Sequence, residues 1–393
     1  MGIELNQDQI YAEYDLEHWW HSSTKQTFEI VGAAGTGKTT VIRYFIQQLG
    51  LELDEVLFIA YMGKAVSQMN KNGLPAKTMH SACYKYEQEF VRDEETGKIV
   101  FDAKGKPMLK PVFKLRDKIG KNIKLIIIDE GYMIPENNAK DILSFGIPIV
   151  VLGDPNQLPP VFGNPFFLVD PDVTLHQIMR QKEGDPIVYL SQQVLAGKEL
   201  VDGVYNKSCV ISKKNLTRYQ MEQSDVVLTC TNKLRYEVNS LFREQFLGIR
   251  NLELPHQGEK IICRRNNWSK SIDGGLYLTN GTAGTVDYID RSRYNPKNHT
   301  IDVDFKPDFT KKSFKDITID VDALNSPPGQ YQSYKFGCNL FEYSYAITIH
   351  LSQGSQYNNV LVMYDSTSYD KEYNKALKYT AITRAMESVI FCH

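Results

Sequence analysis

The chain has 393 residues, more than one compact core usually supports, so two core domains with smaller insertions are expected. Its 45 basic and 47 acidic residues nearly cancel, so any surface for nucleic acid must be a local groove rather than a property of the whole chain. The six cysteines lack the spacing of a zinc site or a disulfide framework, and no apolar run reaches the roughly 18 residues of a membrane span, so we expect reduced thiols, no membrane association and a cytoplasmic location.

Short apolar runs alternate with helical segments from about residue 27 to residue 180, the pattern of a parallel sheet covered on both faces. The runs that fit buried parallel strands are 28–31, 56–60, 125–128 and 147–152. Each ends at polar or glycine residues, where such sheets place their ligands. The charged, turn-rich segment between 90 and 116 predicts a β-hairpin that stands out from the sheet, although a plain surface loop explains it equally well.

A second alternating stretch starts near residue 225 and resumes at Tyr345. Between its halves, from about 285 to 340, lies a β-rich segment punctuated by proline and glycine. This arrangement predicts a second α/β domain that carries a small barrel-like insert.

The first strand runs directly into Gly32-Ala-Ala-Gly-Thr-Gly-Lys-Thr39, which satisfies the phosphate-binding pattern G-x-x-x-x-G-K-[ST] between a strand and a helix. The glycines let backbone N–H groups point at phosphates, Lys38 supplies a cation, and the Thr39 hydroxyl can ligate Mg²⁺. A glycine-rich turn without nucleotide is disfavoured because the fixed positions and the flanking elements agree. The predicted nucleotide-binding residues of this loop are Gly32, Gly35, Thr36, Gly37, Lys38, Thr39 and Thr40.

Two later strands end in residues suited to nucleotide hydrolysis. The run 125–128 is followed by Asp129, which can hold the Mg²⁺ shell, and by Glu130, which can orient or deprotonate the attacking water. Such a pair also caps helices, so by itself it is a weak signal for a metal site and becomes a strong one only together with the phosphate-binding loop. The next strand ends at the segment 153–160, which contains Gln157. This segment has two interpretations: Gln157 senses the γ-phosphate, or the segment is a proline-rich turn without a catalytic function.

In order and spacing, the motifs at 5–9, 32–39, 129–130, 153–160, 345–355 and 378–384 resemble those of superfamily 1 helicases, in particular the RecD/Dda-like group. This resemblance implies an α/β fold with two RecA-like P-loop NTPase domains and the cofactors ATP and Mg²⁺. By the same resemblance the first domain (1A) comprises 1–89 and 117–182, the second (2A) 183–284 and 341–393, the hairpin at 90–116 is the pin (1B) that splits duplex, and 285–340 is an SH3-like insert (2B). Val100, Phe101 or Phe113 would press on the last base pair, though ordinary hairpin packing explains them too.

The resemblance also assigns roles around the nucleotide. Gln9 lies in a segment similar to the Q motif and would read adenine. Arg180, within 176–181, and Arg384, within 378–384, would stabilise the charge on the γ-phosphoryl group as it leaves. Leu351 and Gln356 stand where the family usually has lysine and glutamate, which removes one cation near the strand and one carboxylate that often holds the ribose, so the ribose contacts are expected to differ.

Segments 60–65, 78–81, 230–239 and 345–355 are similar to family motifs that touch the single strand or belong to the second domain. The residues predicted to contact nucleic acid are Tyr61, Lys64, Thr78, His80, Asn232, Thr348 and His350. Tyr61 stands where the family usually has proline, so it either offers a stacking surface for a base or packs at a strand end. A lone histidine is more often a structural residue, and His80 and His350 are assigned only through their motifs.

The function predicted is an ATP-dependent 5′–3′ DNA helicase that translocates on single-stranded DNA and separates duplex. The alternatives are a single-strand translocase that remodels protein–DNA complexes and an ATP-switched DNA-binding module; a small-molecule kinase would leave most motifs unexplained. The expected partners are single-stranded DNA and duplex junctions, with single-strand-binding or replication and recombination proteins as candidates. We expect a monomer in the cytoplasm, or in the host cytoplasm if the chain is phage-encoded.

Overall fold

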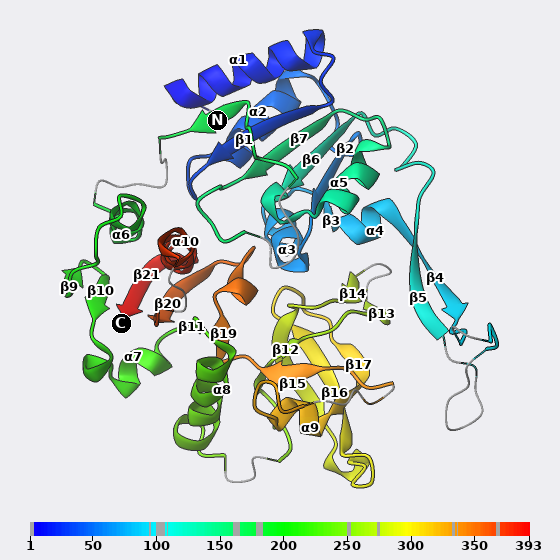
Figure 1. Cartoon of the computed structure of the whole chain (residues 1–393), viewed down its shortest axis with the longest axis vertical. Coiled ribbons are helices and arrows are strands. Elements are labelled where there is room, and N and C mark those ends of the chain that lie inside the picture. The colour runs from blue at the N-terminus through cyan, green and yellow to red at the C-terminus, as the bar shows by residue number, and fades with distance from the viewer. Residues whose placement is uncertain are drawn as a thin grey trace.

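The computed structural model describes residues 4–93, 96–99, 107, 109–159, 166–177, 184–249, 253–272, 276–331, 335, 337–366 and 370–393. Within them the chain forms two α/β lobes, a β-rich subdomain beside the second lobe and a projecting two-stranded hairpin (Figure 1). Val100, Phe101 and Arg180 lie outside the described residues. Among the residues described, no helix has both the length and the apolar character needed to cross a bilayer.

The first lobe is built on a six-stranded parallel sheet with the order β3-β2-β6-β7-β1-β8. Its strands are β1 (Thr27–Gly32), β2 (Val56–Ala60), β3 (Ala76–Thr78), β6 (Leu125–Asp129), β7 (Ile149–Gly153) and β8 (Val173–Leu175). The four strands predicted for this region are confirmed. β7 lies between the strand that precedes the phosphate-binding loop and the strand that ends at Asp129.

Successive side chains of a strand point to opposite faces, so each central strand supplies two cores. In β6, Leu125 and Ile127 pack with the side of the sheet covered by α1 (Gln7–Ser22), α2 (Lys38–Gln48) and α3 (Gly63–Lys71). The alternate residues Ile126 and Ile128 pack on the other face with α4 (Met79–Cys83) and α5 (Glu136–Leu143). The sheet is therefore covered on both faces, as its apolar strands predict.

The second lobe has a six-stranded sheet with the order β19-β11-β20-β21-β10-β9, parallel except at the edge strand β9. Its strands are β9 (Gly203–Tyr205), β10 (Ser208–Ile211), β11 (Val226–Thr229), β19 (Ala346–Thr348), β20 (Tyr357–Met363) and β21 (Ala385–Cys392). Helices α6 (Pro186–Leu195) and α10 (Lys371–Ile382) cover one face. Helix α8 (Asn232–Leu241) packs on the other, and the short helix α7 (Arg218–Glu222) precedes β11.

The β-rich subdomain is a five-stranded antiparallel sheet with the order β17-β16-β15-β12-β18. Its strands are β12 (Lys260–Cys263), β15 (Ala283–Ile289), β16 (Thr300–Pro307), β17 (Phe314–Asp320) and β18 (Phe341–Tyr343), with β13 (Asn267–Ile272), β14 (Leu276–Leu278) and α9 (Val321–Asn325) beside it. The predicted bounds 285–340 are too narrow, because the flanking strands β12 and β18 pair within the same sheet. Its core is continuous with that of the second lobe, since Val286 and Phe305 belong to one apolar cluster with Val227 and Leu361.

The hairpin consists of β4 (Tyr84–Phe90) and β5 (Leu109–Leu115), which pair antiparallel from Tyr84 opposite Leu115 to Phe90 opposite Leu109. It therefore begins at Tyr84 rather than at the predicted residue 90, and it stands out from the first lobe (Figure 1). Phe113 faces Tyr86 and contacts the rings of Tyr84 and His80, so it lies at the base of the hairpin. These contacts support the alternative of ordinary hairpin packing for Phe113, and its role as an apolar surface against a base pair stays a prediction.

Gly284 allows β15 and β16 to approach closely. A Cβ at this position would lie 2.1 Å from the Lys306 carbonyl oxygen and 2.8 Å from the Pro307 Cα, both of which are backbone atoms of the paired strand. We expect Gly284→Ala to lower the free energy of unfolding by about 1–3 kcal/mol, measured by thermal denaturation. Gly203→Ala in β9 is the control, because its Cβ would meet only the Tyr205 ring at 3.7 Å; equal shifts in Tm would show that the close approach at Gly284 is not what requires glycine.

Candidate functional site

The loop between β1 and α2 is shaped to hold an anion. Gly37 precedes α2 in the left-handed conformation (φ +83°), and a Cβ there would lie 2.2 Å from the Gln9 Nε2, so glycine is required. The Lys38 Nζ donates hydrogen bonds to the carbonyls of Gly32 (2.6 Å) and Ala33 (3.2 Å), which holds the ammonium group over the loop. Backbone N–H groups at the start of a helix, together with this cation, make a phosphate site.

Gln9 joins the first helix to this loop. Its backbone N–H donates to the Asn6 side-chain oxygen (2.9 Å), and its own side-chain oxygen accepts from the Asn6 N–H (3.0 Å), which forms a capping box at the start of α1. Its Nε2 donates to the Thr36 carbonyl (3.1 Å), and the side chain is buried. Gln9 thus supports the phosphate-binding loop, and its contact with adenine stays a prediction.

The two acidic residues lie at the end of β6, in the same cleft as the loop. Glu130 has a left-handed backbone (φ +52°, ψ +43°), a conformation rare outside glycine and frequent at functional sites, and its N–H donates to the Asp129 carboxylate (3.1 Å). The cleft has a volume of about 360 Å³, and both lobes contribute to its lining. The predicted residues that line it are Gly35, Gly37, Lys38, Thr39, Thr40, Asp129, Glu130, Gln157 and Arg384.

The environment of the cleft raises the pKa of both carboxyl groups. Burial raises the pKa of Asp129, and the nearby charge of Lys38 partly offsets the increase. Burial and then repulsion from Asp129 raise the pKa of Glu130 to about 7, against the opposing charges of Arg384 and Lys38. A carboxyl group with a pKa near neutrality is suited to accept a proton from water. The Thr39 hydroxyl and the Asp129 carboxylate provide the oxygen ligands that Mg²⁺ prefers, so the residues of the cleft fit this metal.

Two arginines were predicted to stabilise the leaving phosphoryl group. Arg384 is buried, and its guanidinium donates to the Thr380 carbonyl (3.2 Å) and the Ser355 carbonyl (3.2 Å). Arg384 lines the same cleft as Asp129 and Glu130, and its charge opposes the rise in the pKa of Glu130. Arg180 lies outside the described residues, so its role stays a prediction.

The loop that carries Gln157 makes contacts that the sequence did not indicate. The buried Asp154 carboxylate accepts hydrogen bonds from the Tyr379 hydroxyl (2.7 Å) and the Gln157 Nε2 (3.4 Å). The Leu158 N–H donates to the Thr380 hydroxyl (2.9 Å), so the first lobe is bonded to α10 of the second. These residues stand inside the segments 153–160 and 378–384, but nothing in their types or spacing shows that they pair with one another.

The predicted single-strand contacts of the first lobe follow β2 and β3. The His80 ring lies among Tyr61 (centroids 5.8 Å apart), Tyr84 (5.7 Å) and Phe113 (5.6 Å), and burial lowers the pKa of its imidazole. Tyr61 is half-buried by the same packing. Thr78 caps α4 by accepting from the Ser81 N–H (3.3 Å). Lys64 lies in the first turn of α3, and its ammonium group has no hydrogen-bond partner in the described part of the chain.

The predicted contacts of the second lobe follow β11 and β19. Asn232 is exposed at the first residue of α8, and Thr348 accepts from the Leu351 N–H (3.3 Å). The His350 Nε2 lies 3.1 Å from the Tyr373 hydroxyl, and burial lowers the pKa of this imidazole. The predicted strand contacts of the first lobe and those of the second lie close to a point where the two lobes meet. At this point a Cβ added at Gly354 of the second lobe would lie 3.4 Å from the Ala65 Cβ of α3.

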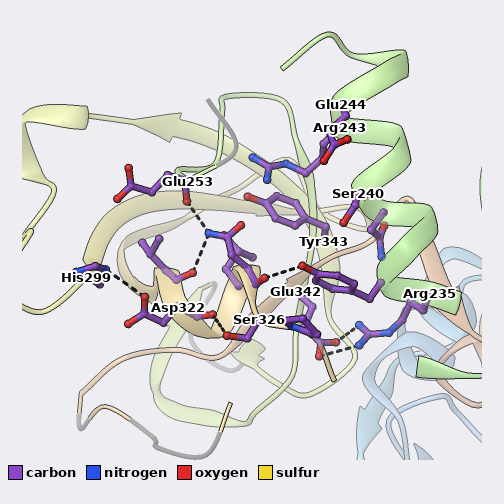
Figure 2. A pocket seen from close by; sticks show the side chains of 16 residues that line it. Arg235, Ser240, Arg243, Glu244, Glu253, His299, Asp322, Ser326, Glu342 and Tyr343 are labelled. Carbon is purple, nitrogen blue, oxygen red and sulfur yellow. Dashed lines mark hydrogen bonds and ion pairs between the residues drawn. The ribbon is translucent and has the colours of Figure 1, made fainter. Parts of the chain in front are cut away.

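A second cavity, of about 530 Å³, lies between α8 and the β-rich subdomain, and none of the predicted site residues lines it (Figure 2). Arg235 forms a bidentate ion pair with Glu342, and Arg264 binds the same carboxylate at 3.0 Å (Nε to Oε2). The Tyr343 hydroxyl is buried and has no hydrogen-bond partner among the described residues. These interactions join α8 to the subdomain, and we assign this cavity no part in the nucleotide site.

Comparison with known proteins places this site in a family. A model described as an AAA domain matches residues 5–213, more than half of the chain, and one described as the UvrD-like helicase C-terminal domain matches residues 343–392. Similar curated proteins include the ATP-dependent RecD2 DNA helicase of Deinococcus radiodurans (24% identical, 91% of this chain and 46% of the relative) and an uncharacterized protein of Methanocaldococcus jannaschii (24% identical, 91% and 36%). The chain thus spans less than half the length of these relatives.

Solved structures share the fold over nearly the whole chain. A Pif1 helicase from Bacteroides in complex with ADP-AlF3 and ssDNA aligns with a TM-score of 0.53 at 15% identity, covering 99% of this chain and 92% of that one. Pif1 helicase from Candida albicans aligns with a TM-score of 0.50 at 17% identity, covering 99% and 94%. A structure described as the basis for DNA unwinding at forked dsDNA by two coordinating Pif1 helicases aligns with a TM-score of 0.54 at 16% identity, covering 99% of this chain and 92% of that one. The mixed α/β architecture with parallel sheets is therefore the RecA-like one of these proteins.

We expect Lys38→Ala and Glu130→Gln to abolish ATP turnover and to leave the fold intact, measured by steady-state hydrolysis and circular dichroism. Lys38→Ala removes the cation at the phosphates, so nucleotide binding weakens as well. Glu130→Gln removes the proton acceptor, so hydrolysis falls by at least about 100-fold while nucleotide binding remains. Glu136→Gln, on the exposed face of α5, is the control; near-normal hydrolysis in either site variant would contradict the assignment.

Proposed function

Because the chain belongs to the AAA-domain family and to the RecD/Pif1-like helicases of superfamily 1B, we propose that it is an ATP-driven motor that moves 5′ to 3′ along single-stranded DNA and separates duplex DNA. The observation that carries the proposal is the cleft lined by both lobes. Lys38, Glu130 and Gln157 come from the first lobe, and Gly354, Gln356 and Arg384 come from the second. A nucleotide in this cleft touches both lobes at once.

The residues of the cleft divide the work of hydrolysis. Lys38 neutralises the outer phosphates, and Thr39 and Asp129 would hold Mg²⁺, which supplies further charge neutralisation there. Glu130 accepts the proton of the attacking water, which Gln157 orients. Arg384 stabilises the charge on the departing phosphoryl group from the opposite lobe. Turnover therefore requires that the lobes lie together.

Movement follows if the nucleotide changes the grip of each lobe on the strand. Only a difference in binding free energy between two states shifts a conformational equilibrium. The chain offers a direct route for such coupling, because Gly354 and Gln356 line the cleft while Thr348 and His350, a few residues earlier in the same segment, are the candidate strand contacts. Tyr61, Lys64 and Thr78 provide the grip of the first lobe, and Asn232 adds to that of the second.

DNA is proposed as the substrate because the RecD2 relative is described as a DNA helicase, one Pif1 structure is described as a complex with ssDNA, and another concerns DNA unwinding at forked dsDNA. We propose that the antiparallel hairpin β4–β5 acts as the pin that divides the strands, and that the five-stranded β-rich sheet is the SH3-like insert. We propose ATP and Mg²⁺ as cofactors and a monomer that works in the cytoplasm at duplex junctions, alongside single-strand-binding, replication or recombination proteins.

The experiment that tests this function compares two matched duplexes, one with a 5′ and one with a 3′ single-stranded tail, while ATP hydrolysis is recorded. We expect DNA to stimulate hydrolysis and the 5′-tailed duplex to open preferentially, because travel toward the junction requires loading on that tail. Preferential opening of the 3′-tailed duplex would reverse the direction. Stimulated hydrolysis without opening would favour the translocase, and hydrolysis that DNA does not stimulate would remove the motor.

A further inference from the structure

The loop that carries Gln157 leaves the first lobe abruptly. Gly153 is the last residue of β7, and it pairs with Val31 of β1 in the sheet of the first lobe. The chain returns to the core of that lobe at Phe167, which is 1% exposed. Between these points, residues 154–158 extend away from the first sheet and meet the second lobe.

Leu158 anchors the loop in the second lobe through its side chain and both of its backbone groups. The side chain is 1% exposed and packs in the apolar core formed with Leu190 of α6 and Leu377 of α10. The N–H donates to the Thr380 hydroxyl (2.9 Å), and the carbonyl accepts from the Gln353 Nε2 (2.7 Å). All of these partners belong to the second lobe, although Leu158 follows a strand of the first.

Tyr379 holds the other end of the same loop. Its ring is 1% exposed within α10, and its hydroxyl donates to the Asp154 carboxylate at 2.7 Å. Among the described residues, the other side chains and N–H groups that donate to that carboxylate belong to Asn156 and Gln157, both from the loop itself and both uncharged. A buried carboxylate depends strongly on each such donor, so the Tyr379 hydroxyl is the main contribution of the second lobe to the position of Asp154.

We infer that Tyr379 is a positioning residue that ties loop 154–158 to the second lobe, so that Gln157 moves with α10 when the lobes open and close. The inference rests on the proposed function and assigns a pivot within it, between Gly153, bonded to the first sheet, and Asp154, bonded to the second lobe. Gln157 then reaches the phosphate only when the second lobe is in place. Hydrolysis is thereby restricted to the closed state.

The test uses Tyr379→Phe, which keeps the buried ring and removes only the hydroxyl. The Tyr379 hydroxyl also bonds to the backbone of Ala34 in the phosphate-binding loop, so the variant removes one contact there as well. Because the main effect is that Gln157 loses its fixed position, kcat for ATP should fall about tenfold, by a larger factor than KM changes. The number of base pairs opened per ATP hydrolysed should fall as well. A purely structural role would instead lower the melting temperature and leave both the kcat of the folded protein and this ratio unchanged.

The matched control is Tyr343→Phe, which removes a buried hydroxyl of the second lobe that has no hydrogen-bond partner among the described residues (Figure 2). It should hydrolyse ATP at the wild-type rate. Leu158→Ala releases the other anchor, and its effect on kcat should be less than additive with that of Tyr379→Phe, because both variants free one loop. A Tyr379→Phe protein with wild-type kcat, or a Tyr343→Phe protein with an equal loss, overturns the inference.

Failure of the proposed function would be visible separately. If DNA does not stimulate ATP hydrolysis by the wild-type protein, the proposed motor function is refuted, whatever the results for the variants. In that case the same comparison of kcat and KM is made on basal hydrolysis, which also requires Gln157 at the phosphate. A tenfold loss confined to Tyr379→Phe would then still support the tie between loop and lobe, and its absence would refute it.

Discussion

The parallel pairing of β1, β7 and β6 is the constraint on which the site depends. Because the strands run in one direction, their carboxyl ends lie at one edge of the sheet, and the phosphate-binding loop, the loop with Gln157 and the acidic pair are brought side by side. A parallel sheet must be apolar on both faces, which explains the unbroken isoleucine run before Asp129. The charges of the cleft are thus confined to the rim of an apolar layer, where burial and mutual repulsion raise the pKa of Glu130.

The second lobe completes this edge rather than merely covering it. Arg384 lies near the acidic pair, Tyr379 bonds to Asp154, and Leu158 occupies an apolar core that belongs to the other lobe. The same lobe shares its opposite core with the β-rich subdomain, so a movement of α10 relative to the first sheet carries that subdomain with it. In the proposed motor, closure around a nucleotide and displacement of the predicted strand-binding surface are therefore one motion. We propose that through this connection ATP binding moves residues at a distance from the phosphates.

The sequence predicted those features that follow from local pattern. The four strands of the first sheet, the phosphate-binding loop and the pair at 129–130 all follow from short apolar runs and fixed spacings, and the comparisons confirm the membership of superfamily 1B. The bounds of the two inserts were wrong, because β4, β12 and β18 are flanking strands whose pairing is decided by partners distant in the chain. The bonds of Tyr379 and Leu158 could not be predicted for the same reason. The packing of His80 could not be predicted from the sequence either, because the three aromatic rings around it are brought together only by the fold.

The central claim is that the nucleotide in the cleft changes the grip on a single strand. The direct measurement is the affinity of the protein for a fluorescent single-stranded oligonucleotide without nucleotide, with ADP and with a non-hydrolysable ATP analogue, at one fixed salt concentration. We predict affinities that differ among the three states, with the reciprocal change in nucleotide affinity when the oligonucleotide is bound. Equal affinities in all three states would contradict the claim, because a nucleotide without differential binding cannot drive movement.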